Sequence, residues 1–135
     1  MRGVVIRKAN IIAEDDRRKI VSILNGELIV RDIHILFMKK GKKKTNLFGD
    51  TIEQPLGNHK HWYTEVMYVL KGKCHYWLKN KEGETMECDM EEGDIMFRAP
   101  EIVHTCTCTE DAILIDGASE SWISEDWNHV REVLK

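Results

Sequence analysis

The residues best suited to chemistry in this chain are three histidines and a glutamate, His59, His61, His104 and Glu65. On an unbroken β-strand, residues two apart face the same side, so His59, His61 and Glu65 would project into one space. Imidazole nitrogen and carboxylate oxygen together favour one divalent transition metal ion (Fe, Mn, Ni, Co, Cu or Zn) over calcium or magnesium. The alternative is that these histidines only decorate a surface.

The sequence around these residues resembles the two motifs of the cupin family. Residues 57–72 contain His-x-His, three residues, Glu, six residues and Gly, and residues 93–104 contain Gly-Asp, an apolar strand, Pro and then His. The motifs and the strands between them cover residues 55–117. The resemblance implies an all-β jelly-roll barrel. It assigns the family's metal-ligand roles to His59, His61, Glu65 and His104.

The chain departs from the family pattern near its last histidine. The family usually has a glycine between the proline and that histidine and an asparagine a few residues beyond, whereas this chain reads Pro100-Glu-Ile-Val-His104 and has Cys108 near the asparagine position. In the first motif, Gly57 stands only two residues before His59 instead of at the usual longer spacing. These departures leave two roles open for His104, which is either a metal ligand or an acid or base.

Composition limits the classes of protein to consider. The length of 135 residues predicts a single domain, residues 1–135, and the net charge of -3 argues against a nucleic-acid partner. No apolar run approaches the roughly 20 residues that span a bilayer, and the N-terminus lacks a signal-peptide core, so we expect no membrane partner and a cytoplasmic location.

The four cysteines are expected to be reduced and buried. They lack paired C-x-x-C spacing, and a disulfide between residues two apart would be strained. By alternation, Cys74 and Cys88 lie on the apolar faces of their strands. Cys106 and Cys108 share a face with His104, so they are either small buried hydrophobes or, for Cys106, a thiol near the metal that can be oxidised there.

Short apolar segments separated by turn residues predict the strands of one barrel. Residues 2–12 read as a strand before a charged turn at residues 14–18, and Asn25-Gly26 is a hairpin signal between residues 19–24 and 27–38. Residues 39–58 are expected to be a mobile connection. Further strands are expected at residues 64–70, 73–79, 85–90, 94–98, 103–108 and 111–116, with turns at Gly72, Gly83 and Gly93.

The C-terminal residues change to a helical period. Ser124 suits an N-cap, and Trp127, Val130 and Leu134 fall on one face of a short helix at about residues 124–134. This helix is expected outside the barrel. It either carries Trp122 and Trp127 into the contact of a homodimer or packs on its own chain.

The run Lys39 to Lys44 and the pair Trp62-Tyr63 allow a nucleotide-sugar ligand. Such lysines are usually a solvated turn, but near the barrel mouth they could attract a diphosphate. Trp62 and Tyr63 could stack on a sugar or base, or simply pack.

Three classes of function follow from the resemblance to cupins. A sugar or nucleotide-sugar isomerase or epimerase would use His61 as an acid or base, with Tyr76 or another interior group moving the proton. A metal-dependent dioxygenase would need all four residues as ligands, and a third class only binds a small molecule. A buried carboxylate is costly without a cation, so Glu65 favours metal. A metal-assisted isomerase combines the first two classes.

Overall fold

The computed structural model describes residues 1–40, 43–45, 51–53, 56–59 and 61–120. These residues form thirteen strands, with no helix among them. The helix expected at residues 124–134, with Trp122 and Trp127, lies outside the described residues. No described segment is a helix long and apolar enough to cross a membrane.

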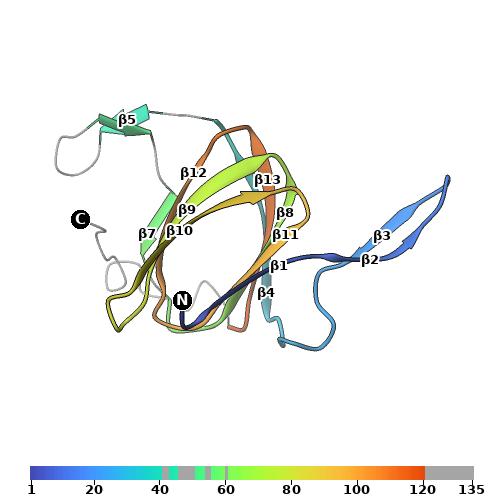
Figure 1. Ribbon diagram of the computed structural model, residues 1–135, viewed down its shortest axis with the longest axis horizontal. Helices are drawn as coiled ribbons and strands as arrows, with labels where there is room; N and C mark the ends of the chain where they lie inside the picture. The colour runs from blue at the N-terminus through green and yellow to red at the C-terminus, as the bar shows by residue number, and fades with distance from the viewer. Residues whose placement is uncertain (41–42, 46–50, 54–55, 60, 121–135) are drawn as a thin grey trace.

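Two antiparallel sheets face each other and form the barrel (Figure 1). The first sheet has the strand order β1 (Val4–Lys8), β11 (Asp94–Arg98), β8 (Glu65–Lys71), β13 (Ala112–Ala118) and β4 (Asp32–Met38). The second has the order β10 (Thr85–Glu91), β9 (Lys73–Lys79), β12 (Val103–Cys108) and β7 (Leu56–His59). Neighbouring strands are mostly far apart in sequence, as in a jelly roll. The all-β jelly-roll fold predicted from the sequence is confirmed.

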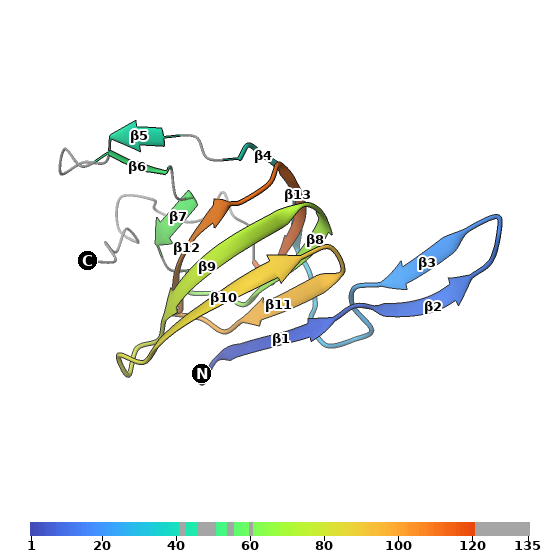
Figure 2. The same cartoon turned by 45° about the horizontal axis from the view of Figure 1, so that its top comes forward.

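Two hairpins complete the described strands. In Figure 2, the hairpin of β2 (Asn10–Glu14) and β3 (Lys19–Ser22) extends away from the barrel. Strand β5 (Lys43–Thr45) pairs with β6 (Thr51–Glu53). Strands therefore form within residues 39–58, which had been expected to be only a connection.

The N-terminal strands differ from the predicted pattern in two ways. The single strand expected over residues 2–12 is divided at Ala9, whose N–H donates to the carbonyl of Gly93, and its halves β1 and β2 have different partners. Asn25-Gly26 does not join paired strands, because β3 pairs with β2 and β4 pairs with β13. The hairpin turn lies instead at the charged residues, where Asp15 Oδ1 accepts from the N–H groups of Arg17 and Arg18.

The six later strands lie where they were expected. Gly72, Gly83 and Gly93 all have positive φ in the turns between them. At Gly72 the turn also needs the absence of a side chain, since a Cβ there would lie 2.1 Å from the carbonyl oxygen of Asp111.

Alternation along the strands separates two groups of buried side chains. The barrel interior holds Met67 and Val69 of β8 together with Leu78, Met96 and Leu114. The opposite face of β8 contributes Val66 and Tyr68 to a second cluster, which packs against Val21, Ile23 and Leu28 among others. Strand β8 is therefore buried on both faces, so the side chain of its first residue, Glu65, lies inside the protein.

The described cysteines are all free thiols. Cys74 lies in the core with Tyr76 and Leu78, as its parity predicted, and Cys88 is half-buried. Cys106 and Cys108 are buried in the interior cluster.

Candidate active site

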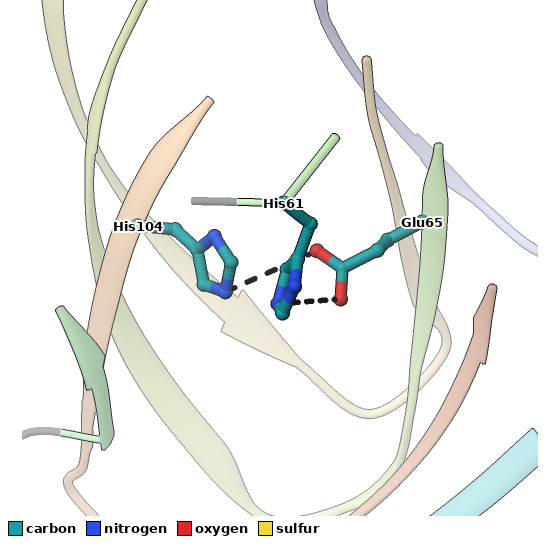
Figure 3. Close-up of side chains that lie close together, drawn as sticks. All are labelled: His61, Glu65 and His104. Atoms are coloured by element: carbon teal, nitrogen blue, oxygen red, sulfur yellow. Dashed lines mark ion pairs between the residues drawn. The ribbon is translucent and has the colours of Figure 1, made fainter. Parts of the chain in front are cut away.

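Three of the four predicted residues meet inside the barrel (Figure 3). His61, Glu65 and His104 are 3%, 5% and 6% exposed, and one ligand atom of each lies within 4.8 Å of the others. The first motif does not form the unbroken strand on which its shared face was predicted. Strand β7 ends at His59 and β8 begins at Glu65, so His61 reaches the glutamate because the chain bends between the two strands.

The two imidazoles approach different oxygens of the same carboxylate. His61 Nε2 lies 3.3 Å from Glu65 Oε1, and His104 Nε2 lies 3.9 Å from Glu65 Oε2. His104 Nδ1 is 3.2 Å from the carbonyl oxygen of Ile102, which can only accept, so Nδ1 carries the proton of the neutral ring. The lone pair of neutral His104 is then on Nε2, facing the cluster. This tautomer suits either a base or a metal ligand.

His59 is placed by its backbone. It is the partner of His104 in the pairing of β7 with β12, and the register of that pair shifts at the next residue. The side chain of His59 lies outside the described part of the structure. Its predicted role as a ligand stays a prediction.

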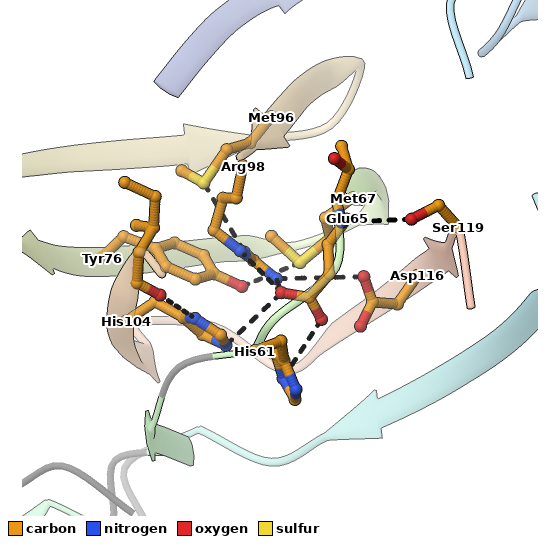
Figure 4. A network of polar contacts seen from close by, with 11 residues as sticks. His61, Glu65, Met67, Tyr76, Met96, Arg98, His104, Asp116 and Ser119 are labelled. Atoms are coloured by element: carbon orange, nitrogen blue, oxygen red, sulfur yellow. Dashed lines mark hydrogen bonds and ion pairs between the residues drawn. The ribbon is translucent and has the colours of Figure 1, made fainter. Parts of the chain in front are cut away.

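Arg98 supplies the counter-charge of Glu65 (Figure 4). It is the last residue of β11 and is directly opposite Glu65 in the pairing with β8. Its Nε and Nη2 donate to Glu65 Oε2 at 3.1 and 2.9 Å. Burial alone would lower the pKa of the Arg98 guanidinium, but the charges of Glu65 and Asp116 outweigh it and raise that pKa. Arg98 is therefore a permanent cation inside the barrel.

Asp116 on β13 is the second carboxyl group beside Arg98. Its Oδ1 is 4.0 Å from Arg98 Nη2, and this buried oxygen has no hydrogen-bond partner within the described residues. Burial, followed by the negative charge of Glu65, raises the pKa of Asp116 to about 7 even though Arg98 opposes the shift. A carboxyl group that titrates near neutrality is able to exchange protons at physiological pH.

Tyr76 on β9 also faces this interior. It is 3% exposed, and its hydroxyl donates to Met67 Sδ at 2.8 Å. Burial raises the pKa of Tyr76 well above its usual value. The phenol therefore stays protonated near neutral pH and is suited to donate a hydrogen bond rather than to act as a base.

The turn before His104 is formed at the position where the chain departs from the family motif. Glu101 has a φ of 71°, in the left-handed region that glycine adopts most easily. Its N–H donates to the carbonyl of His61 at 2.7 Å, which ties this turn to the bend between β7 and β8. A non-glycine residue therefore makes the turn here. The same turn fixes His61 relative to the start of β12.

The aromatic residues after His61 divide between packing and exposure. Tyr63 is buried and stacks on His61, with ring centroids 4.8 Å apart and planes at 16°. Trp62 is half exposed and meets Tyr63 edge to face. Tyr63 thus orients the imidazole, while Trp62 offers a free aromatic surface.

A transition metal ion fits the donors of this cluster. Two buried imidazoles and a carboxylate are the donor types that such ions prefer. Arg98 holds Glu65 Oε2, so Oε1 is the oxygen that faces His61. Arg98 also removes one argument for a metal, because the buried charge of Glu65 already has a cation.

The described lysines of the run lie against Asp111. Lys40 N–H donates to Asp111 Oδ1 at 2.7 Å, and Lys39 Nζ is 3.8 Å from Asp111 Oδ2. Lys42 and the side chains of Lys43 and Lys44 lie outside the described part. The proposed contact of these lysines with a diphosphate therefore stays a prediction.

Comparison with known families identifies the chain. The family model described as the ARD/ARD' family matches residues 2–114. This chain is a cupin of the ARD/ARD' family. No curated protein matches this cupin.

Solved structures share the fold of this cupin. The TDP-quinovose 3,4-ketoisomerase WlaRB from Campylobacter jejuni is 14% identical, with a TM-score of 0.77 and coverage of 98% of this chain and 95% of that one. A variant of the 3,4-ketoisomerase QdtA from Thermoanaerobacterium thermosaccharolyticum, in complex with TDP-4-keto-6-deoxyglucose, is 16% identical, with a TM-score of 0.72 and coverage of 95% and 86%. The dTDP-4-dehydrorhamnose 3,5-epimerase from Sulfolobus tokodaii is 17% identical, with a TM-score of 0.69 and coverage of 99% and 85%.

Two residues of the cupin site were not predicted from the sequence. Arg98 and Asp116 are ionisable residues on the inward-facing side of their strands. Each lies two residues after a buried apolar residue, Met96 before Arg98 and Leu114 before Asp116. A charged residue in phase with buried apolar residues was the signal that could have found them.

Proposed function

We propose that this cupin is a nucleotide-sugar isomerase or epimerase that moves a proton next to a sugar carbonyl. The observation that carries the proposal is the convergence of two buried imidazoles on Glu65, whose charge is balanced by Arg98. Acid or base catalysis needs groups that gain and lose a proton near neutral pH, and imidazole does so. The full-length likeness to sugar ketoisomerases and an epimerase supports the choice of substrate class.

His61 is the base in this proposal. It removes the proton from the carbon next to the carbonyl, and the electron pair left behind forms an enediolate. Glu65 Oε1, at 3.3 Å, stabilises the imidazolium that results. In an isomerase, a proton is then delivered to the former carbonyl carbon. The neighbouring hydroxyl becomes the new carbonyl, and its proton passes to the former carbonyl oxygen. In an epimerase, the proton returns to the opposite face of the original carbon.

His104, Tyr76 and Asp116 are the other groups that can assist. His104 has the tautomer of a second base, with its Nε2 lone pair turned to the cluster. Tyr76 is a protonated donor that can stabilise charge on the substrate oxygen. Asp116 can hold the proton of the cluster, because its pKa is raised to about 7.

A divalent transition metal would be held by His61, Glu65 and His104, with His59 as the fourth expected ligand. When bound, it would polarise the sugar carbonyl and lower the barrier to proton removal. The proton steps written above use only the side chains of the chain. Arg98 pairs with Glu65 and orients its carboxyl group in either case.

A metal-dependent oxygenase is the second candidate. It is favoured by the burial and closeness of the His-Glu-His cluster, which has the donor set of a redox metal site. In that case His61 and His104 would both be ligands. The proton chemistry would then pass to another group.

The deciding experiment follows solvent hydrogen into a nucleotide sugar. The protein is incubated in D₂O with TDP-4-keto-6-deoxyglucose, the ligand of the QdtA complex, and the sugar is followed by proton NMR. We expect deuterium to replace the hydrogen next to the carbonyl and the ring to isomerise or epimerise. His61→Asn should lower exchange at least about a hundredfold, which is the lower range for loss of a general base. His75→Asn, at a half-buried site on β9 outside the cluster, is the matched control and should leave exchange unchanged.

The same samples separate the alternatives. Binding of the nucleotide sugar without exchange would assign the protein to the small-molecule binders. Iron-dependent oxygen consumption with a small organic acid, and no exchange with the sugar, would replace the isomerase proposal by the oxygenase.

A further inference from the structure

Two cysteines on neighbouring strands form a pair that the proposed reaction does not use. Cys74 on β9 and Cys108 on β12 are direct partners in the antiparallel pairing of these strands. Thr109 follows Cys108, and Lys73 precedes Cys74. The N–H of Thr109 donates to the carbonyl of Lys73 at 3.0 Å. This bond identifies Cys74 and Cys108 as a non-hydrogen-bonded pair. In such a pair the Cα atoms are about 4.5 Å apart, within the range that a disulfide spans.

The side chains of this pair lie in the same buried cluster. Both face the barrel interior, with exposures of 1% and 5%. The two thiols therefore face each other across neighbouring strands. The interaction between the two thiols lowers the pKa of Cys108 and raises the pKa of Cys74, so Cys108 is the sulfur that ionises first.

The other two cysteines have different neighbours. Cys106 and Cys88 are both opposite Tyr76, on its two sides. Burial raises the pKa of Cys106 to about 12. Neither residue is opposite a cysteine, so the register selects Cys74 and Cys108.

The pair lies next to a surface cavity and away from His104 of the proposed active site. A cavity of about 590 Å³ is lined by Cys74, by Lys73 and Thr109 beside the pair, and by Lys8, Met90 and Asp94 among others. Cys108 is four residues along β12 from His104, which corresponds to roughly 13 Å at the rise of a strand. A small oxidant in this cavity lies beside Cys74, the direct partner of Cys108, without entering the proposed active site.

We propose that Cys74 and Cys108 form a reversible cross-strand disulfide when the protein is exposed to hydrogen peroxide. The Cys108 thiolate attacks one peroxide oxygen and becomes a sulfenic acid, while the other oxygen leaves as hydroxide and takes a proton to become water. Cys74 then attacks the sulfenic sulfur, loses its own proton and displaces a second water. Two thiols are oxidised by two electrons and one peroxide is reduced to two waters. A small thiol reverses the bond by exchange.

The disulfide would link the two strands that carry Tyr76 and His104. Closing the chain between residues 74 and 108 removes conformations from the unfolded state, so the oxidised protein should melt at a higher temperature. The pair would act as a covalent clamp on the four-stranded sheet.

The test uses the full chain in its native state. Reduced protein is treated with hydrogen peroxide, quenched, blocked with a thiol reagent under denaturing conditions and mapped by mass spectrometry after trypsin. We expect the titratable thiols to fall from four to two. A peptide beginning at Cys74 should be joined to the peptide that contains Cys108, and dithiothreitol should restore all four thiols.

Variants assign the link within the second peptide, which also contains Cys106. Cys106→Ser should keep the link and the rise in melting temperature, and Cys108→Ser should lose both. Cys88→Ser is the control for thiol number. Peroxide treatment that leaves four thiols in the wild type, or a link that persists in Cys108→Ser, would overturn the proposal. If a variant does not fold, fragmentation of the linked wild-type peptide in the mass spectrometer assigns the link to Cys106 or Cys108, and a link to Cys106 would overturn the proposal.

Discussion

Arg98 and Glu65 are opposite each other on β11 and β8, and two guanidinium nitrogens of Arg98 donate to one oxygen of Glu65. Both side chains are almost fully buried, so neither charge is stabilised by bulk water. Each charge is tolerable inside the barrel because the other is present. From the sequence, burial of Glu65 alone favoured a metal. The structure shows that Arg98 is a cation paired with the same carboxylate.

Loss of Arg98 should strongly destabilise the protein. In Arg98→Met, the carboxylate of Glu65 is left buried without its partner, which typically costs about 3–5 kcal/mol. Urea unfolding followed by circular dichroism measures this change. Adding Glu65→Gln to Arg98→Met should recover much of the loss, because the unpaired charge is then removed.

Arg31 provides the matched control for that experiment. Its ion pair with Glu120, at 3.8 Å, is exposed, and such pairs contribute at most about 1 kcal/mol. Equal losses of unfolding free energy in Arg31→Met and Arg98→Met would show that the buried pair contributes no more to stability than the exposed pair.

Asp116 should make stability depend on pH. Its pKa is raised to about 7 in the folded protein, against about 3.9 in an unfolded chain, so the folded state binds more protons between these values. Stability from this group is therefore fully present below about pH 4 and is lost as the pH rises towards about 7. Asp116→Asn should remove the slope and be the more stable form above pH 7, by up to about 4 kcal/mol.

Chemical unfolding across pH 4–8 measures the slope. Asp16→Asn, at an exposed turn position, is the control and should follow the wild type. If wild type and Asp116→Asn differ by the same amount at every pH, Asp116 does not titrate in this window.

Metal content should depend on His104. We expect protein purified without an affinity tag to hold close to one transition metal ion per chain, and His104→Ala to lower this sharply because it removes the only predicted ligand of the second motif. Elemental analysis gives the stoichiometry. His75→Ala is the control for loss of a histidine outside the cluster and should leave the metal content unchanged, because His75 contacts two carboxylates on the outer face of the sheet. Unchanged metal in His104→Ala would exclude it as a ligand.

The lysine run should contribute to recognition of a diphosphate. A nucleoside diphosphate should raise the melting temperature, and replacing Lys42, Lys43 and Lys44 with alanine should weaken both the shift and its dependence on salt. Thermal-shift titrations at two ionic strengths measure this. A variant with alanine at Lys71, Lys79 and Lys81 changes the net charge equally. An equally large loss of the melting-temperature shift in that variant would mean that the effect depends on net charge and not on Lys42, Lys43 and Lys44.

We expect the protein to be a homodimer, and one described face has the required exposed apolar surface. Ile33, Ile35 and Phe37 are 65%, 56% and 75% exposed on one face of β4, the edge strand of its sheet. Exposed apolar edge strands favour association. Light scattering after gel filtration should give twice the chain mass for the wild type. Phe37→Glu should give the monomer, while Ile29→Glu, in the loop before β4, should not. A monomeric wild type at all concentrations would contradict the expectation.

Much of the fold could be predicted because strand alternation and turn residues are local signals. The strands from residue 65 onward, the turns at Gly72, Gly83 and Gly93, and the inward parity of Cys74 follow from periods and turn types within a few residues. The N-terminal strands were harder. Asn25-Gly26 has the composition of a hairpin turn, but the partner of β4 is β13, about eighty residues away in the chain.

The sequence by itself determined which residue types are available for chemistry, and the cupin spacing selected His59, His61, Glu65 and His104 as members of one site. The structure brings His61, Glu65 and His104 together. Only the tertiary structure decided what surrounds them. The pairing of β11 with β8 places Arg98 on Glu65, and β13 brings Asp116 beside both. The pairing of β9 with β12 likewise sets Cys74 against Cys108. Alternation tells which face a side chain occupies, but the register between distant strands depends on packing across the whole barrel, and that register chooses each neighbour.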